Sequence, residues 1–274
     1  GFGELAKSFN AMAVSLKEQC NKLQETERLA VVGELAAGMA HEIKNPMAGI
    51  KVSMEVLCQD SPLGQEDKEV LCRVINEIDR ITALLKGLLN YARPPKPEMV
   101  SLDVNQLLES TIKSAKYALQ NQKNKPKDPE RQLKFVKDFN QNLPQIVADP
   151  GQLQQIFLNL ILNAVDAISS ITDRQGVITI QTTRPSDEFV EISIADNGKG
   201  IESVSLEKIF NPFFTTKPQG TGLGLAITKR LIEQYNGGRI VVANNPDGNG
   251  VTFTITLPVH QIESSLDVGT TKKL

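Results

Sequence analysis

The 274-residue sequence predicts an α-helical part followed by an α/β part: an antiparallel helical hairpin, then a sandwich whose sheet is mixed and mostly antiparallel. Three observations predict this fold class. Hydrophobic residues recur every three or four positions up to about residue 92, a proline-rich segment follows, and β-branched residues alternate with polar residues beyond it. With 30 Lys and Arg against 32 Asp and Glu, the net charge of −2 gives no reason to expect a nucleic-acid partner.

The hairpin is predicted from two helical segments that a break at residues 61–64 separates. The second segment, 66–92, carries a seam that repeats every 3.5 residues: Leu71, Val74, Ile78, Ile81, Leu85 and Leu88. The first segment carries a matching stripe: Val32, Leu35, Met39, Ile43, Met47, Ile50, Met54 and Leu57. A single hairpin buries two such stripes poorly, so we expect a homodimer in which two hairpins form a four-helix bundle.

The α/β part begins after a linker at 94–100, where three prolines end the preceding helix. We expect strands at 133–139, 177–183, 189–195, 239–243 and 251–257. We expect helices at 104–119, 150–169 and 223–235. These elements predict a sheet covered by helices on one face, with a polar loop at 120–131 and a disordered tail at 261–274.

The cysteines and the hydropathy pattern exclude several classes of protein. Cys20, Cys58 and Cys72 lie in predicted helices with neither Cys-x-x-Cys spacing nor a neighbouring His, which argues against a disulfide framework and a zinc site. We expect small buried or half-buried side chains at these positions. No run approaches the ~20 apolar residues that cross a bilayer, and no signal-peptide pattern is present, so we expect a soluble chain in a reducing compartment.

The helix predicted at 150–169 carries the first candidate site. Asp149 is an N-cap candidate ahead of a proline, and Gln152 occupies the capping-box position. Within this apolar helix Asn159, Asn163 and Asp166 share one face. They either form hydrogen bonds within the core or face a polar ligand. Phosphates with a divalent ion are favoured, because amide and carboxylate oxygens are ligands of Mg²⁺.

Two glycine-rich segments and the residues between them form the second candidate site. Asp196-Asn197-Gly198-Lys199-Gly200-Ile201 follows a predicted strand, and alone it is consistent with a plain turn. Gly220-Thr221-Gly222-Leu223-Gly224-Leu225 opens a helix, where alternate glycines let backbone amides approach an anion such as phosphate. The spacing matches neither a dinucleotide-binding motif nor a Walker loop. Between the two segments, Phe210 and two further phenylalanines predict a lid with an apolar anchor, and Thr215-Thr216-Lys217 places a cation near a phosphate.

The third candidate site is His41-Glu42-Ile43-Lys44-Asn45-Pro46 on the first long helix. His41 projects away from the apolar seam if Met39 and Ile43 face it. An exposed His is either a solvated residue or a nucleophile. Glu42 favours the second interpretation, because a carboxylate that accepts one imidazole proton leaves the other nitrogen nucleophilic.

These motifs resemble, in order, the phosphoacceptor, N, G1, F and G2 boxes of bacterial two-component sensor histidine kinases. The boxes lie at residues 41–46, 159–164, 196–200, 210–214 and 220–225. Residues 3–12 also resemble the end of a HAMP signal-relay module. The resemblance implies a HAMP-like end and signalling helix at 1–28, a dimerisation and phosphotransfer domain at 29–93 and an ATP-binding domain at 101–260. It also implies that the chain is the cytoplasmic portion of a receptor anchored in the inner membrane.

The resemblance further implies a Bergerat-type ATP-binding fold and a role for each box. Asp196 would accept a hydrogen bond from the adenine amino group, Asn163 would coordinate Mg²⁺, and a lid at 202–219 would cover the triphosphate of ATP. His41 would receive the γ-phosphoryl group, Glu42 would orient or deprotonate it, and Asn45 would place a water that dephosphorylates the partner response-regulator receiver domain. Nucleotide contacts are implied at Asn159, Asn163, Asp166, Asp196, Gly198, Lys199, Gly200, Ile201, Phe210, Thr215, Thr216, Lys217, Gly220, Thr221, Gly222, Leu223, Gly224 and Leu225.

One departure and two alternatives belong beside this resemblance. Many family members carry Lys or Arg three residues after the N-box Asn, where this chain has Asp166, so a positive phosphate contact must come from elsewhere, such as Lys217 or Lys199. ATPases that share the nucleotide fold carry a catalytic Glu where this chain has Asn159, which disfavours hydrolysis. A nucleotide-binding scaffold without histidine phosphorylation is the other alternative.

Overall fold

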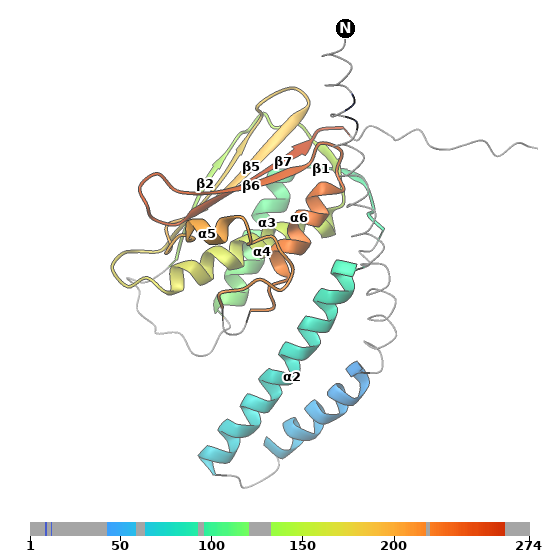
Figure 1. Ribbon diagram of the computed structural model, residues 1–274, viewed down its shortest axis with the longest axis vertical. Helices are drawn as coiled ribbons and strands as arrows, with labels where there is room; N and C mark the ends of the chain where they lie inside the picture. Colours follow the sequence, from blue (N-terminus) through green and yellow to red (C-terminus); the bar gives the residue numbers. More distant parts are fainter. Residues whose placement is uncertain are drawn as a thin grey trace, which may run out of the picture. The chain divides into compact units, whose positions relative to one another are not determined.

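The computed structural model describes residues 9, 12, 43–58, 64–92, 96–120, 133–217 and 220–260. The chain divides into two compact units (Figure 1). The helical unit comprises residues up to 95 together with 215–223, and the α/β unit comprises 96–214 and the residues from 224 onward. His41, Glu42 and the HAMP-like segment 3–12, apart from two residues of that segment, lie outside the described residues.

The helical unit contains a helix over residues 43–58 and the helix α2, Gln65–Ala92. The predicted second helix, 66–92, is therefore confirmed to within one residue. An ion pair joins the two helices, with Lys51 Nζ 2.6 Å from Asp79 Oδ1. Ile78 in the predicted seam is buried, whereas Val74 and Ile50 are exposed. A single hairpin thus leaves part of both stripes in contact with solvent.

The α/β unit contains a five-stranded sheet that confirms the predicted mixed, mostly antiparallel arrangement. Its strand order is β2-β4-β5-β7-β6. The strands are β2 (Lys134–Phe139), β4 (Val177–Thr183), β5 (Phe189–Asp196), β6 (Arg239–Asn244) and β7 (Val251–Pro258). The β2–β4 pair is parallel, and the other three pairs are antiparallel. β5 lies at the centre of the sheet, so its end is flanked by strands on both sides.

Three helices cover one face of this sheet: α3 (Val104–Gln120), α4 (Pro150–Ser169) and α6 (Gly224–Glu233) (Figure 1). α4 packs against α3, α6 and the strands β4 and β5, so it is the central helix of the layer. Its apolar face is fully buried at Leu153, Phe157 and Leu160. Alternate residues of β5 are buried beneath it, as expected for a strand with one face on the core. A short helix, α5 (Ser203–Leu206), follows β5.

The first turn of α4 is fixed by Asp149. Its Oδ1 accepts from the amide of Gln152 at 2.9 Å, so the predicted N-cap is confirmed. In a capping box the side chain of Gln152 would accept from the amide of Asp149. Here that amide donates instead to the hydroxyl of Tyr235 at 3.2 Å. The second carboxylate oxygen accepts from the amide of Glu98 at 2.6 Å. The cap therefore ties three segments of the α/β unit together.

Two three-residue strands precede α4 and form a small antiparallel sheet of their own. They are β1, Val100–Leu102, and β3, Ile146–Ala148. Val100, the last residue of the expected linker, therefore pairs with Ala148.

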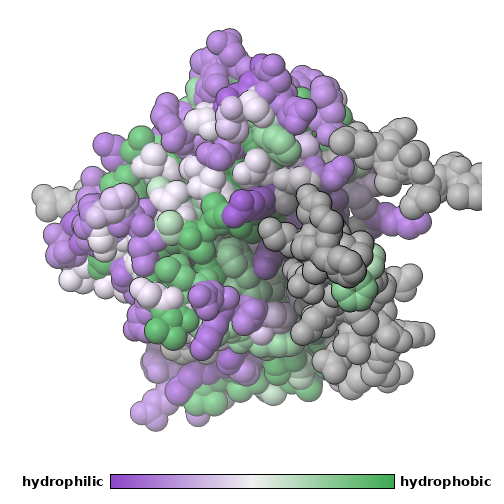
Figure 2. All heavy atoms as spheres, turned by 45° about the horizontal axis from the view of Figure 1, so that its top comes forward, coloured by the Kyte–Doolittle hydropathy of each residue, from purple (hydrophilic) through white to green (hydrophobic). Residues whose placement is uncertain are grey.

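The surface carries hydrophobic side chains in patches as well as singly, as the green areas of Figure 2 show on one face. In the described helices of the hairpin, the exposed large hydrophobic residues are Ile50, Val52, Val56, Leu57, Val70 and Val74. Among the described residues, no helix has both the length and the apolar character needed to cross a bilayer. The exposed apolar surface is the kind that protein partners cover.

Candidate nucleotide-binding site

The site centres on Asp196, the last residue of the central strand β5. Its side chain is only 5% exposed, although it is a carboxylate with no Lys or Arg among the groups that shift its pKa. Burial raises the pKa of Asp196, and hydrogen bonds from the amides of Gly198 and Val251 partly oppose this. The Gly198 amide donates to Oδ1 at 2.8 Å. A buried acceptor held in one orientation is suited to reading a hydrogen-bond donor on a ligand.

Two glycines let the surrounding backbone approach Asp196 closely. A Cβ on Gly198 would lie 2.8 Å from both Ala167 Cβ on α4 and Asp196 Oδ1. Gly250 has a φ of +81°, and a Cβ there would collide with the carbonyl oxygen of Asp196. Neither position accepts a side chain without a backbone shift. The sequence predicted the importance of Gly198 but missed Gly250, which precedes β7 in a turn that resembles many others.

Arg174 holds the loop after Asp196 from one side. Its Nε donates to the carbonyl of Asn197 and its Nη2 to the carbonyl of Gly198, each at 3.1 Å. A guanidinium presents donors in a fixed planar fork, so the two bonds fix the positions of successive carbonyls. Asn197 adds a further tie, because its Oδ1 accepts from the amide of Val177 at 2.8 Å. Sequence reasoning missed Arg174, which lies in the irregular segment between α4 and β4.

Two asparagines, Asn244 at the end of β6 and Asn245 directly after it, hold the same loop from the other side. The Asn244 side chain accepts from the amide of Ile201 at 2.9 Å and donates to its carbonyl at 2.7 Å. The Asn245 Nδ2 donates to the carbonyl of Asp196 at 2.7 Å. Gly200, which precedes Ile201 in this loop, has a φ of +74°, a conformation that glycine adopts without strain. The predicted residues Ile201 and Gly200 are thus positioned by their backbone, while Lys199 is exposed.

The three polar residues on α4 do not share one environment. Asn159 is half-buried, and its Nδ2 lies 3.4 Å from both the Gly224 carbonyl and the Thr228 hydroxyl of α6. It therefore joins two helices, which corresponds to the core hydrogen-bonding interpretation. Asn163 is half-buried and Asp166 is exposed. Across the described part of the chain, no group of three or more His, Cys, Asp or Glu side chains is arranged to hold a metal.

Of the three phenylalanines in the segment predicted as a lid, one is exposed. Phe213 is 60% exposed and has a φ of +65°, a strained conformation for an aromatic residue. Phe214 and Phe210 are half-buried. The Lys229 Nζ lies 5.7 Å from the centroid of the Phe210 ring, which anchors this phenylalanine to α6.

The second glycine segment forms a series of tight turns. The amide of Lys217 donates to the Thr215 hydroxyl at 3.0 Å, and the amide of Gly220 donates to the Lys217 carbonyl at 3.1 Å. Gly222 has a φ of +67°. The Thr221 hydroxyl accepts from the amide of Leu223 at 3.3 Å.

α6 begins at Gly224, one residue after the predicted start. Leu225 in its first turn is half-buried, whereas Thr215 and Thr216 are exposed. A Cβ on Gly224 would lie 4.0 Å from Asn159, which is an ordinary contact, so packing alone does not require this glycine.

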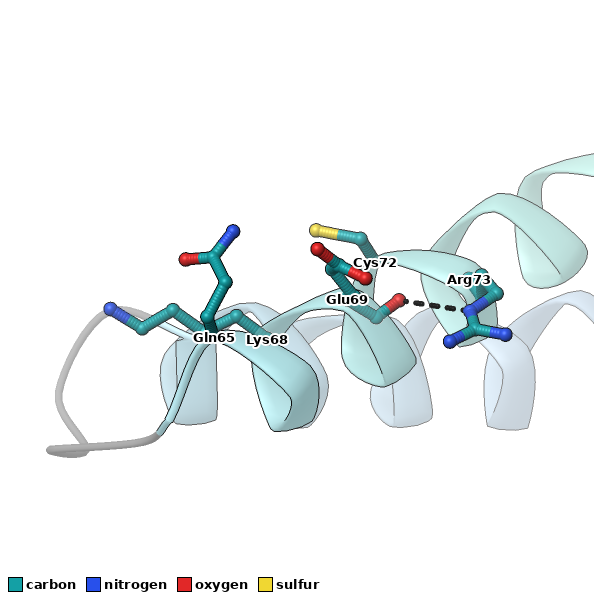
Figure 3. A pocket seen from close by; sticks show the side chains of 5 residues that line it. All are labelled: Gln65, Lys68, Glu69, Cys72 and Arg73. Atoms are coloured by element: carbon teal, nitrogen blue, oxygen red, sulfur yellow. Dashed lines mark hydrogen bonds between the residues drawn. The ribbon is translucent and has the colours of Figure 1, made fainter.

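Of the predicted phosphoacceptor segment, the structure describes residues from 43 onward. Lys44 and Asn45 are helical and exposed. A separate hollow lies farther along the hairpin on α2, lined by Gln65, Lys68, Glu69, Cys72 and Arg73 (Figure 3). None of the residues predicted for nucleotide binding or phosphotransfer lines it.

The fold and the site define a nucleotide-binding α/β sandwich joined to a helical hairpin. Two family models match the chain: "Histidine kinase-, DNA gyrase B-, and HSP90-like ATPase" over residues 148–261 and "His Kinase A (phospho-acceptor) domain" over residues 31–96. The sensor kinases AtoS and ZraS of Escherichia coli (strain K12) are each 39% identical to it, over 89% and 88% of this chain. The chain spans 38% and 48% of their respective lengths.

Solved structures agree with these matches. Full-length ShkA in complex with AMPPNP superposes with a TM-score of 0.67 and 25% identity, covering 84% of this chain and 46% of ShkA. The histidine kinase ThkA in complex with the response regulator TrrA gives a TM-score of 0.60 and 27% identity, covering 85% of this chain and 63% of the other. The chain belongs to the two-component sensor histidine kinases, and it carries the phosphoacceptor and ATP-binding parts of that family.

Proposed function

We propose that the chain transfers the γ-phosphoryl group of ATP to His41 and then passes it to an Asp of a response-regulator receiver domain. In the first step the terminal P–O bond of ATP breaks, ADP leaves, and a P–N bond forms on the imidazole. In the second step that P–N bond breaks and an acyl phosphate forms on the regulator. The observation that carries the proposal is the buried carboxylate of Asp196. Gly198 and Gly250 pack so closely against this residue that neither position has room for a side chain.

Asp196 is suited to accept a hydrogen bond from the adenine amino group, because its orientation is fixed by the Gly198 amide. Asn163 is the residue that would hold Mg²⁺, since its amide oxygen is a hard ligand and it lies half-buried one turn beyond Asn159. Bound Mg²⁺ neutralises charge on the phosphates. The remaining catalytic effect is positioning, which the backbone turns at 198–201 would provide.

The predicted roles of the phosphoacceptor residues remain part of the proposal. Glu42 orients or deprotonates the imidazole of His41. Asn45 places a water for dephosphorylation of the regulator, and its exposed position on the helix is compatible with access by a partner domain. A second protomer would cover the exposed apolar residues of the hairpin, so the proposal includes a homodimer. It also includes anchorage of the full-length protein in the inner membrane, with this part on the cytoplasmic side.

ATP hydrolysis without histidine phosphorylation has less support. The position of the catalytic Glu of related ATPases holds Asn159, whose side chain amide contacts α6. An amide cannot act as the general base for an attacking water.

Incubation with γ-labelled ATP tests the proposal. We expect label on the protein that is labile in acid and stable in base, and its complete loss in His41→Gln. His260→Gln is the matched control, because His260 is the other histidine of the chain and is exposed; it should keep full labelling. Release of inorganic phosphate without labelled protein would instead indicate an ATPase. Neither product, with nucleotide still bound, would indicate a scaffold.

A second experiment separates phosphatase from kinase activity. Asn45→Ala should be labelled as well as the unmodified protein, yet dephosphorylate a phosphorylated receiver domain more slowly. Lys44→Ala, at the neighbouring exposed position, serves as the control for a general effect of surface truncation. Equal dephosphorylation rates for the Asn45 variant and the unmodified protein would remove Asn45 from the mechanism.

A further inference from the structure

The helical hairpin brings together two cysteines that are separated by 14 positions in the sequence. The Lys51–Asp79 ion pair, 2.6 Å between Nζ and Oδ1, sets the register of the two antiparallel helices. Cys58 lies seven residues after Lys51, and Cys72 lies seven residues before Asp79. Seven residues are two helical turns, so each cysteine occupies the same face as its ion-pair residue. The register therefore places Cys58 opposite Cys72, toward the turn of the hairpin.

The electrostatics of Cys58 agree with this placement. Desolvation raises the pKa of the Cys58 thiol, and both charge interaction and a hydrogen bond with Cys72 raise it further, while Lys68 lowers it. A hydrogen bond between the two side chains requires that the thiols be neighbours. Both cysteines are free.

The two thiols differ in accessibility. Cys72 is exposed and its side chain extends beside Glu69 at the hollow on α2 (Figure 3), whereas Cys58 is half-buried. A reagent in solution therefore meets Cys72 first, and Cys58 is placed to react in a second step. An accessible thiol beside a resolving thiol is the arrangement that thiol–disulfide exchange needs, and the raised pKa of Cys58 makes its attack the slower of the two steps.

We propose that Cys58 and Cys72 form a reversible disulfide that links the two helices of one hairpin when a small-molecule disulfide is the oxidant. The Cys72 thiolate attacks one sulfur of the oxidant, which forms a mixed disulfide and releases one thiolate. Cys58 then loses its proton and attacks the Cys72 sulfur, which releases the second thiol. The protein loses two protons and two electrons, and the oxidant takes them up to become two thiols. The proposal is independent of the kinase function.

The experiment uses the full chain with Cys20→Ser, which leaves Cys58 and Cys72 as the two thiols. The protein is incubated with oxidised glutathione, quenched with an alkylating reagent, and measured by intact mass and non-reducing gel electrophoresis. We expect a monomer on the gel, a mass lower by two hydrogens, loss of both alkylation sites, and their full return after reduction. A tryptic map should contain one cross-linked pair of peptides.

Two variants keep this test sharp. With Cys58→Ser as well, Cys72 has no resolving partner, so a stable glutathione adduct should accumulate. With Cys72→Ser and Asn76→Cys instead, the second thiol moves four residues, about 6 Å, along the helix and out of register, and closure should be lost. Two glutathione adducts on the Cys20→Ser protein, a disulfide-linked dimer, or equal closure in the Asn76→Cys variant would each overturn the proposal.

Discussion

Arg174 donates to the carbonyl of Gly198 at 3.1 Å, and so a side chain from the α4–β4 connection fixes the loop that follows the buried Asp196. A second bond of the same length reaches the carbonyl of Asn197. Backbone carbonyls offer no sequence signal that would reveal such a partner. The loop conformation therefore depends on a residue outside every motif that the sequence displays.

Arg174→Gln should weaken nucleotide binding without preventing folding. Loss of two bonds from a partly exposed guanidinium should raise the dissociation constant of a fluorescent ATP analogue about tenfold, or about 1.4 kcal/mol. Arg174→Lys keeps a single charged donor group, so its dissociation constant should lie between those of the unmodified protein and Arg174→Gln. The control is Arg184→Gln, which removes a surface ion pair with Asp187 at 2.9 Å and should bind normally. Equal affinities for the Arg174→Gln and Arg184→Gln proteins would contradict the prediction.

Gly250→Ala should destabilise the α/β unit far more than Gly248→Ala. Both glycines have positive φ, +81° and +76°, so both substitutions introduce backbone strain. Only at Gly250 would the new Cβ strike the carbonyl of Asp196; around Gly248 nothing lies within 4 Å. In urea unfolding we expect losses of at least about 3 kcal/mol at Gly250 and about 1 kcal/mol at Gly248. Similar losses of unfolding free energy in the two variants would show that backbone strain from the positive φ accounts for both, and that the collision with Asp196 adds nothing.

Gly224→Ala should separate the fold from ligand binding. The added Cβ would make only an ordinary 4.0 Å contact with Asn159, so the free energy of unfolding should change by less than about 1 kcal/mol. If the glycine is there for close approach of phosphate, affinity for the ATP analogue should nevertheless fall severalfold. Calorimetric titration measures both enthalpy and affinity. Unchanged affinity would remove Gly224 from the ligand contacts.

The stability contribution of Asp196 should depend on pH with a definite sign. Burial raises the pKa of Asp196, so the folded protein keeps this proton to a higher pH than the unfolded chain does. Its contribution is complete below the ordinary carboxyl pKa of about 3.9 and is lost as the pH rises through the raised value. The unfolding free energy of the unmodified protein minus that of Asp196→Asn should therefore fall as the pH is raised. Urea titrations at several pH values measure it; a difference that rises with pH would mean that the pKa is lowered.

The elements with strong local signals were predictable from the sequence. α4 has the bounds that its sequence predicts, because Asp149 caps it and a proline fixes its first turn. β4 also matches its prediction, since seven alternating residues distinguish a strand from a helix. β1 and β3 were missed because strands of three residues are too short to show alternation.

The candidate site was predictable only where its residues carry a pattern. Asp196, Gly198 and Gly200 stand together in one motif after a strand, and the structure places them in one loop. Gly250 and Arg174 lie 54 and 22 residues away from Asp196 in the sequence, and they approach the backbone of Asp196 and of Gly198, respectively, which leaves no pattern in the sequence. The assignment of Asn159 to a ligand stays a prediction, because its Nδ2 contacts a neighbouring helix and a polar residue on a buried face can be satisfied in that way as well.

The bond between the Glu98 amide and Asp149 bears on how the ATP-binding part should be excised for separate study. A fragment that starts at residue 101, the boundary suggested by the sequence, would cut β1 after its first residue and delete one partner of the α4 cap. Starting at Lys96 retains both, and the longer fragment should unfold at higher urea concentration than the shorter one.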